Sequence, residues 1–200
     1  DSSPKEREKQ ICMNDYKYVD LILGKQCQTK MGRGGIRPLE FKTFSKEMQN
    51  AITNYCQAGG NFFVSGAYVA SDLWDNRLVK ANEEDKKFAM EVLKYKWRVG
   101  QAARNGKVKS VASPFPEITG SYTYYQDLNP ESYVVESPDA LEPAAQGAFT
   151  ILRYSENNLS AGIAYKGNYK TCVLGFPFEA IRTVTERELL MKAILTFFEH

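Results

Sequence analysis

The amino-acid sequence predicts an α/β fold, in which a mainly parallel, helix-flanked sheet is extended by an antiparallel β meander in the C-terminal half. Three observations lead to this prediction. Residues 16–66 follow a strand–loop–helix–strand pattern, which is typical of parallel strands joined by a crossover helix. Residues 106–175 contain short apolar stretches separated by turn sequences, and residues 185–200 carry an apolar stripe at helical spacing.

The N-terminal half supplies the parallel part of the predicted sheet. It begins with "YKYVDLILG" at 16–24, which alternates and then becomes continuously apolar, as buried parallel strands do. An amphipathic helix follows, for which Thr43 or Ser45 can cap the start and Gly59 supplies the left-handed residue at the end. "NFFVSG" at 61–66 reads as the second buried strand, so we expect the two strands to be parallel.

The rest of the chain contains two further helices and a run of strands before the terminal helix. A short helix is expected over 70–79, and a longer one over 82–97, where Asn82 caps the start. Thr185 and Glu188 have the spacing of a capping box at the start of the terminal helix. The strands expected in between span 107–111, 120–126, 132–136, 148–154, 159–165 and 169–176.

Composition and charge are those of an ordinary globular domain. The chain has 200 residues, of which 43% are hydrophobic and 25% charged, and its net charge of +2 indicates no nucleic-acid partner. No apolar run approaches the roughly 20 residues of a membrane-spanning helix. We expect one domain over 16–200, preceded by a polar segment at 1–15. Because that segment cannot form a buried strand, we expect a first strand–helix unit and other domains of the parent protein upstream.

Cysteine and histidine usage argues against a metal centre. The four cysteines are scattered without C-x-x-C spacing, and the single histidine is His200, the last residue. The even cysteine count permits one or two disulfides without requiring them. The glycine-rich run "GRGGIRP" at 32–38 lacks the G-K-[ST] ending of a phosphate-binding loop, and the chain has no dinucleotide fingerprint. We therefore expect neither a metal nor an organic cofactor.

Two stretches carry a resemblance to a known family. "AGGNFFVSGAYVASDL" at 58–73 and "SAGIAYKGNYKTCVLGFPFEAI" at 160–181 resemble the glutamine-amidotransferase-like domain of large secreted Bacteroidetes proteins that are labelled xanthan lyases. The resemblance covers residues 16–200. It implies a flavodoxin-like doubly wound sheet and a secreted, periplasmic or cell-surface location. Active members of the wider superfamily use a cysteine at a strand-to-helix elbow, together with a histidine and a glutamate after a late strand.

The catalytic triad of that superfamily is absent here. The elbow reads Ser65-Gly66-Ala67-Tyr68, without cysteine, and the place of the His-Pro-Glu sequence is taken by Phe176-Pro177-Phe178-Glu179. A cysteine or serine nucleophile needs a base within hydrogen-bond reach, and a histidine at the very end of the chain is a poor one. Ser65 is therefore a candidate nucleophile without a base, and Cys27 is the least unsuitable thiol.

Carboxylates are the remaining candidates for chemistry at the strand ends. Asp72, Asp75 and Glu179 follow two different predicted strands, so they could converge at the carboxyl edge of the sheet. Paired carboxylates there could perform glycosidase chemistry or hold a divalent cation. The alternative is structural: Asp72 could support the short helix, and Glu179 could bind backbone N–H groups of the elbow.

Aromatic and basic side chains near the same edge suggest a sugar ligand. Tyr68, Trp74 and Phe178 could form a platform for a sugar ring, or they could pack the short helix onto the sheet. Arg37, on the long glycine-rich loop, could neutralise the carboxylate of an acidic sugar.

Two functions therefore remain open. The first is a non-catalytic amidotransferase-like module of a secreted or cell-envelope protein, associated with carbohydrate, with polysaccharide and the other domains of its parent protein as partners. The second is a polysaccharide lyase or hydrolase that uses carboxylates with Tyr or Arg at the strand ends. The chain retains the strand-to-helix elbow but has no cysteine there and no histidine placed to act as a base. This combination favours the non-catalytic module.

Overall fold

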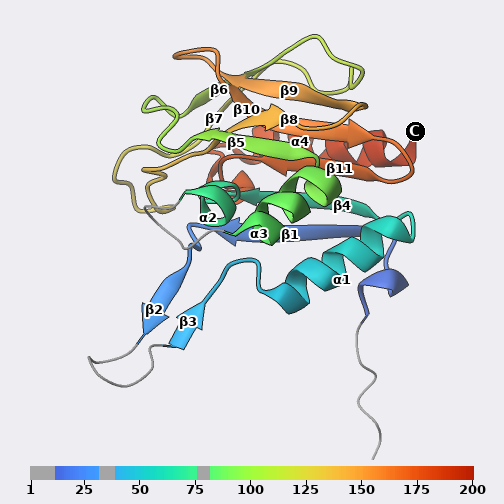
Figure 1. Ribbon diagram of the computed structural model, residues 1–200. Helices are drawn as coiled ribbons and strands as arrows, with labels where there is room; N and C mark the ends of the chain where they lie inside the picture. Colours follow the sequence, from blue (N-terminus) through green and yellow to red (C-terminus); the bar gives the residue numbers. More distant parts are fainter. Residues whose placement is uncertain (1–11, 32–38, 76–81) are drawn as a thin grey trace, which may run out of the picture.

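The computed structural model describes residues 12–31, 39–75 and 82–200, which are built around a seven-stranded sheet (Figure 1). The strand order is β1–β4–β11–β10–β9–β6–β7. β1 (Tyr18–Gly24), β4 (Asn61–Gly66) and β11 (Lys170–Leu174) are parallel neighbours. The other pairings are antiparallel and involve β10 (Ser160–Lys166), β9 (Ala148–Tyr154), β6 (Lys107–Ser110) and β7 (Ser121–Thr123).

The antiparallel meander is confirmed, but the expectation of a mainly parallel sheet is wrong. Only the pairings β1–β4 and β4–β11 are parallel, and the sheet is mostly antiparallel. The reason lies in the connections. The short turns that follow β9 and β10 leave no room for a crossover, so they can join only antiparallel strands. The parallel part is thus confined to three strands at one side of the sheet.

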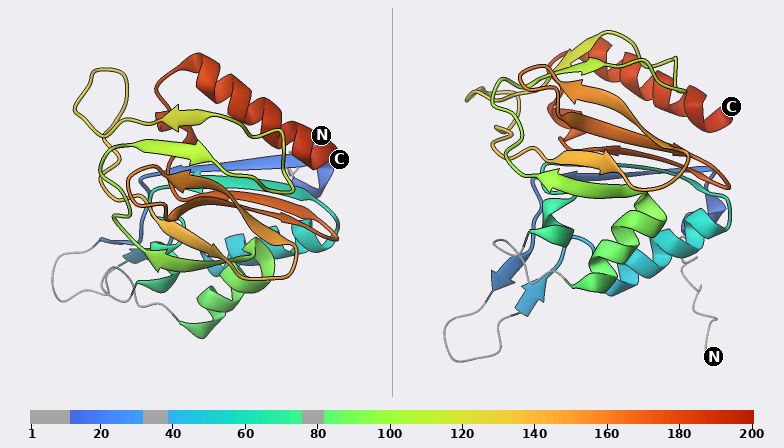
Figure 2. Two further views of the ribbon diagram at one scale, coloured as in Figure 1. Left: turned by 90° about the horizontal axis from the view of Figure 1, so that it is seen from above. Right: turned by 45° about the horizontal axis from the view of Figure 1, so that its top comes forward.

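Helices cover both faces of the sheet. α1 (Lys46–Gln57) and α3 (Glu83–Phe88), which continues into the π-helix η2 (Ala89–Leu93), lie on one face. α4 (Val184–Glu199) lies on the other, as the right-hand view of Figure 2 shows. The smaller elements are η1 (Met13–Asp15), α2 (Ser71–Trp74), η3 (Phe178–Ala180), the hairpin of β2 (Thr29–Met31) and β3 (Leu39–Phe41), and the ribbon of β5 (Tyr95–Val99) with β8 (Ala140–Pro143).

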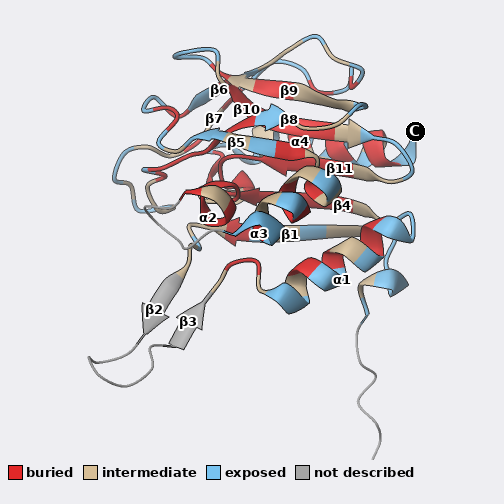
Figure 3. Ribbon diagram, in the orientation of Figure 1, coloured by how far each residue is buried: buried red, intermediate tan, exposed pale blue. Residues whose placement is uncertain are grey.

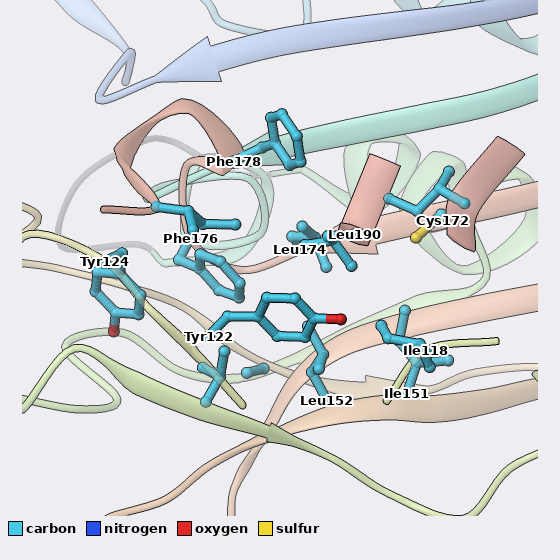
Figure 4. Packing of buried hydrophobic residues seen from close by; sticks show 14 of the residues in the cluster. Ile118, Tyr122, Tyr124, Ile151, Leu152, Cys172, Leu174, Phe176, Phe178 and Leu190 are labelled. Atoms are coloured by element: carbon cyan, nitrogen blue, oxygen red, sulfur yellow. The ribbon is translucent and has the colours of Figure 1, made fainter. Parts of the chain in front are cut away.

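The apolar run of β4 supplies the core on both faces, because successive side chains of a strand point to opposite sides. Phe62 and Val64 pack with Ile52 and Leu93 in the cluster under α1 and η2. Phe63 belongs to the opposite cluster, which includes α4 residues and the aromatic side chains near β7 and β11 (Figures 3 and 4). β4 is therefore buried from both sides, which fixes the turn that follows it.

Several helix boundaries follow the sequence closely. Ser45 caps α1, with its hydroxyl accepting a hydrogen bond from the Met48 N–H, and Gly59 adopts the expected positive φ of 91° after the helix. Asn82 caps α3 as expected. The terminal helix begins two residues earlier than expected, because Thr183 and Glu186 form its capping box.

Two expected elements differ from the structure. The helix expected over 82–97 ends at Leu93, where Lys94 turns left-handed with φ 69°, and the chain continues as β5. β5 pairs with β8, a partner more than 40 residues away whose pairing leaves no local signal in the sequence. The residues expected to form a strand over 132–136 form no regular element, although the Val135 N–H donates to the Tyr125 carbonyl at 3.0 Å. Among the described residues, no helix is long and apolar enough to span a membrane.

Candidate functional site

The carboxyl ends of the three parallel strands meet at one edge, as the sequence predicts. Leu174 of β11 is paired with Ser65 of β4, and Gly24 of β1 is paired with Gly66. The N–H of Ala67 donates to the Gly24 carbonyl at 2.9 Å, so the elbow after β4 is tied to the end of β1. The predicted neighbourhood of the elbow and the segment after β11 is confirmed.

Ser65, the candidate nucleophile, is inaccessible. Its side chain is fully buried at 0% exposure, and its Oγ accepts a hydrogen bond from the Phe178 N–H at 3.3 Å. The hydroxyl therefore holds the chain after β11 against the elbow. A buried hydroxyl without a neighbouring base cannot attack a substrate, so the geometry gives Ser65 a structural role.

Backbone N–H groups at the start of α2, just after the elbow, bind a carboxyl group from within the protein. Oδ2 of Asp139 accepts hydrogen bonds from the N–H groups of Ala70 and Ser71, both at 2.8 Å, and from the Ser71 hydroxyl at 3.1 Å. Its Oδ1 accepts from Trp97 Nε1 at 3.2 Å. Complete burial raises the pKa of Asp139 to about 7, and these four donors work against that rise.

Asp139 was not identified from the sequence. It lies in "ESPDALEP", a stretch without helical or strand periodicity, and the donors that it binds are about 40 and 70 residues away in the chain. Only the three-dimensional arrangement brings them together.

Asp72 is also committed to structure. Its carboxylate accepts hydrogen bonds from the N–H of Gln28 at 2.5 Å and from the N–H of Thr43 at 3.2 Å. These residues lie before and after the β2–β3 hairpin. The hydrogen bonds to Asp72 therefore hold both ends of the hairpin against the start of α2. Burial raises the pKa of Asp72, and the two backbone donors oppose the rise. Asp72 is thus structural, but its hydrogen bonds go to the chain on either side of the hairpin and not to the short helix that the sequence suggested it supports.

Glu179 lies in a different cluster from Asp72. The Tyr133 hydroxyl donates to its Oε1 at 2.5 Å, while Oε2 is buried without a hydrogen-bond partner in the described part of the chain. Gly24, with φ +56°, lies so close that an added Cβ would be 3.2 Å from both Glu179 Oε1 and the Tyr133 hydroxyl. Glu179 therefore bonds to Tyr133, and no bond to an elbow N–H is found within the described residues.

The carboxylate that interacts with Glu179 is Asp20 of β1, which the sequence did not single out. Partial desolvation and the negative charge of Glu179 together raise the pKa of Asp20 to about 6, although the residue is exposed at the surface of β1. The pKa of Tyr133 is also raised, by burial and by its hydrogen bond to Glu179. A carboxyl group with a raised pKa beside a second carboxylate is a feature of acid–base sites.

The predicted aromatic platform does not form. Phe178 is buried and packs edge-on against Phe63, with ring centroids 5.8 Å apart. Trp74 packs against the core cluster under α1. Tyr68 differs from both, since it lines an open cavity beside the elbow. Arg37 lies outside the described residues.

Among the described residues, three segments line this cavity, which has a volume of about 360 Å³. Tyr68, Ser71 and Asp75 come from the elbow and from α2 with the residue that follows it. The end of β5 and the chain after it contribute Gly100 and its neighbours, and Ser137 comes from the chain before β8. Asp75 is thus a predicted carboxylate that lines the cavity, but the residue is buried, with 5% of its surface exposed.

The cysteines offer no activated thiol. All four are free. Burial, followed by the charge of Asp72, raises the pKa of Cys27 above its ordinary value, and burial raises that of Cys56 to about 12. A nucleophilic thiol requires a lowered pKa.

In the described segments, no group of three or more His, Cys, Asp and Glu side chains is arranged to hold a metal ion.

Comparisons with known proteins give only distant structural likenesses. No family model and no curated protein matches the chain. The exo-β-1,4-mannosidase Op5Man5 from Opitutaceae bacterium strain TAV5 aligns with 92% of this chain at a TM-score of 0.47 and 8% identity. The chain spans 25% of that mannosidase. The mmIFT52 N-terminal domain aligns with 79% of this chain, over 73% of its own length, at a TM-score of 0.42 and 14% identity. Both TM-scores lie below 0.5, so neither likeness assigns a function.

Proposed function

We propose that this chain is a non-catalytic, amidotransferase-like module that binds its ligand without converting it. The observation that carries the proposal is the hydrogen bonding of backbone N–H groups at the elbow and just after it. In acyl transfer, N–H groups at a strand-to-helix turn stabilise the oxyanion of the intermediate. Here the Ala67 N–H of the elbow donates to the Gly24 carbonyl at 2.9 Å. The N–H groups of Ala70 and Ser71, at the start of α2, donate to the Asp139 carboxyl group.

Two further observations support a non-catalytic elbow. Ser65 is buried and accepts a backbone hydrogen bond, and Cys27 has a raised pKa, so neither is an activated nucleophile. The single histidine, His200, ends the chain, so no imidazole base is available near the elbow. In this proposal the elbow is a structural turn without a catalytic role.

The setting of the module is part of the same proposal. The sequence resemblance to the amidotransferase-like domain of secreted Bacteroidetes proteins supports a flavodoxin-like ancestry, for which the parallel strands β1, β4 and β11 are the relevant part. It also supports a secreted, periplasmic or cell-surface location, polysaccharide as a partner, and further domains in the same parent protein.

Activity assays test this proposal directly. We expect the purified chain to release no ammonia from glutamine, to produce no unsaturated product from acidic polysaccharides, and to release no reducing ends from neutral ones. Reproducible turnover in any of these assays would contradict the proposal, provided that a single substitution in the chain abolishes it.

One observation favours a second candidate, a polysaccharide lyase or hydrolase. Asp20, with its pKa of about 6, could hold a proton near Glu179, and Tyr133 lies within hydrogen-bond distance of Glu179. An acid–base pair of this kind is what such enzymes use. If this candidate is correct, Asp20→Asn and Glu179→Gln will each abolish turnover of a polysaccharide, whereas Asp15→Asn, on the exposed η1, will not.

A further inference from the structure

The outer side of α4 concentrates exposed apolar side chains. The inner side of this helix packs on the sheet through five buried residues, which are Leu190, Ala193, Ile194, Phe197 and Phe198. The helix lies at the outside of the molecule (Figure 2). On its other side Val184 is 60% exposed, Leu189 58% and Leu195 38%. These are three of the seven large hydrophobic residues that are exposed in the described part of the chain, and such concentration marks interaction surfaces.

A groove runs along this outer side of α4. Its volume is about 530 Å³, and its surface is mostly apolar. Apart from Phe178 of η3, every described residue that lines the groove belongs to α4, and these residues recur at helical spacing, as Val184, Glu188, Met191 and Leu195 do. The 16 residues of α4 make a helix of roughly 24 Å. A groove that follows a helix over this length has the shape to receive a second helix.

Two charged side chains of the groove are available to a partner. Glu188 and Lys192 lie one helical turn apart, and neither side chain forms an ion pair or a hydrogen bond with a described residue. The other two charged groups of the groove are already bonded within the chain. Arg187 donates to backbone carbonyl groups, and Glu199 accepts a hydrogen bond from the Tyr18 hydroxyl at 3.3 Å.

The order of the two free charges makes this face complementary to itself. In an antiparallel pair of α4 helices, related by a two-fold axis at the level of Leu190, Glu188 of each copy lies opposite Lys192 of the other. The same register brings Val184 of each copy beside Leu195 of the other and keeps Met191 near the axis. A parallel pair would instead place like charges together. Self-complementarity about a two-fold axis is the property of an isologous dimer interface.

We propose that the groove along α4 is a homodimer interface, in which α4 of a second copy lies antiparallel to it. The apolar side chains of the two helices leave water together, and two Glu–Lys pairs fix the register. A contact that centres on one helix is smaller than the roughly 800 Å² per partner of a standard interface. We therefore expect a reversible dimer with a Kd of about 10–100 µM. This interface does not depend on whether the elbow is catalytic.

Sedimentation velocity at protein concentrations from about 1 to 500 µM tests the proposal. We expect the mass to rise from that of the 22.7 kDa monomer toward twice this value. Leu195→Glu puts a charge into the apolar part of the groove and should weaken the dimer by about tenfold or more. The matched control, Leu128→Glu, makes the same change at a leucine that is 94% exposed and lies outside α4, so it should leave the association unchanged.

Charge reversal tests the register of the two helices. Glu188→Lys and Lys192→Glu each place like charges opposite one another at two points, so each should weaken the dimer by about tenfold or more. The double variant restores both opposite-charge pairs and should return the Kd to within about threefold of the wild type. Circular dichroism of each variant, at a concentration where the wild type is monomeric, establishes that it is folded.

Three results would overturn the inference. A wild type that stays monomeric over the whole concentration range would show that no second copy binds the groove. A dimer that persists in folded Leu195→Glu, or that Leu128→Glu weakens equally, would place the interface elsewhere. A folded double charge variant that associates as weakly as the two single variants would refute the antiparallel register.

Discussion

Asp139 and Ser71 are joined by two hydrogen bonds to the same carboxyl oxygen, from the Ser71 N–H at 2.8 Å and from its hydroxyl at 3.1 Å. Asp139 lies just before β8, and Ser71 is the first residue of α2. The pair therefore connects the β5–β8 ribbon to the elbow of the parallel strands.

The substitution Asp139→Ala is expected to destabilise the fold strongly. It leaves the buried N–H groups of Ala70 and Ser71 and the Trp97 indole without an acceptor, which should lower the free energy of unfolding by about 3 kcal/mol or more. Urea unfolding of the purified variant measures this change. The control is Asp127→Ala, whose exposed side chain pairs with Arg182 at 3.3 Å and should contribute about 0.5 kcal/mol or less. Equal effects of the two substitutions would contradict the role given to Asp139.

Asp20 should make stability depend on pH. Its pKa is raised from 3.8 to about 6 in the folded state, so the folded chain binds more protons than the unfolded chain between these values. The contribution of Asp20 to stability is therefore present below about pH 4 and is lost as the pH rises to about 6. We expect the wild type to lose stability relative to Asp20→Asn over this window.

Denaturant unfolding of both proteins from pH 4 to pH 7 measures this difference. The comparison with Asp20→Asn is needed because burial also raises the pKa of Asp139, which titrates in both proteins with the same sign. Parallel curves for the two proteins would show that the Asp20 carboxyl does not interact with Glu179 as the structure indicates.

The start of α4 distinguishes two neighbouring threonines. Thr183 accepts a hydrogen bond from the Glu186 N–H at 3.1 Å, whereas Thr185 is exposed within the first turn. Thr183→Ala should cost about 1 kcal/mol of stability, and Thr185→Ala should cost only a few tenths. Thermal or urea unfolding of the two variants checks this, and the reverse order of effects would support the capping box expected from the sequence.

Thiol labelling should distinguish the four cysteines by how far each is exposed. Cys12 is exposed and Cys27 partly so, while Cys56 and Cys172 are buried. In native protein we expect an aromatic disulfide reagent to react with Cys12 first and Cys27 more slowly, and with the other two only after unfolding. Mass spectrometry of the labelled peptides identifies the sites. Rapid native labelling of Cys172 would contradict its burial in the core cluster, where it lies on β11 (Figure 4).

The parts of the fold that could be predicted from the sequence are those with strong local signals. The apolar runs of β1 and β4, the cap at Asn82 and the hairpin turns of the meander each specify structure within a few residues. The proportion of parallel to antiparallel strand pairs could not be predicted, because it depends on which strands, distant in the sequence, become neighbours in the sheet. The β5–β8 ribbon is an example: Tyr95 pairs with Pro143, and nothing near either residue indicates the other.

The candidate site was predictable in location but not in chemistry. The edge formed by the three parallel strands follows from the order of strands and turns, and Tyr68 and Asp75 were correctly placed near it. Ser65 and Asp72 also lie near this edge, but the backbone groups that they bind, those of Phe178 for Ser65 and of Gln28 and Thr43 for Asp72, are distant in the sequence and could not be predicted from it. The roles of Asp139 and Asp20 depend on hydrogen-bond donors and neighbouring charges that are distant in the sequence and come close only in the folded chain.

A covalent probe of the elbow tests the central claim most directly. The glutamine analogue 6-diazo-5-oxo-L-norleucine alkylates an activated nucleophile that binds glutamine, and intact-mass spectrometry detects the adduct. The occupied N–H groups of Ala70 and Ser71 and the buried Ser65 predict no change in mass for the native wild type. A stoichiometric adduct that maps to Ser65 or Cys27, and that is lost in Ser65→Ala or Cys27→Ser, would show that the elbow is catalytic.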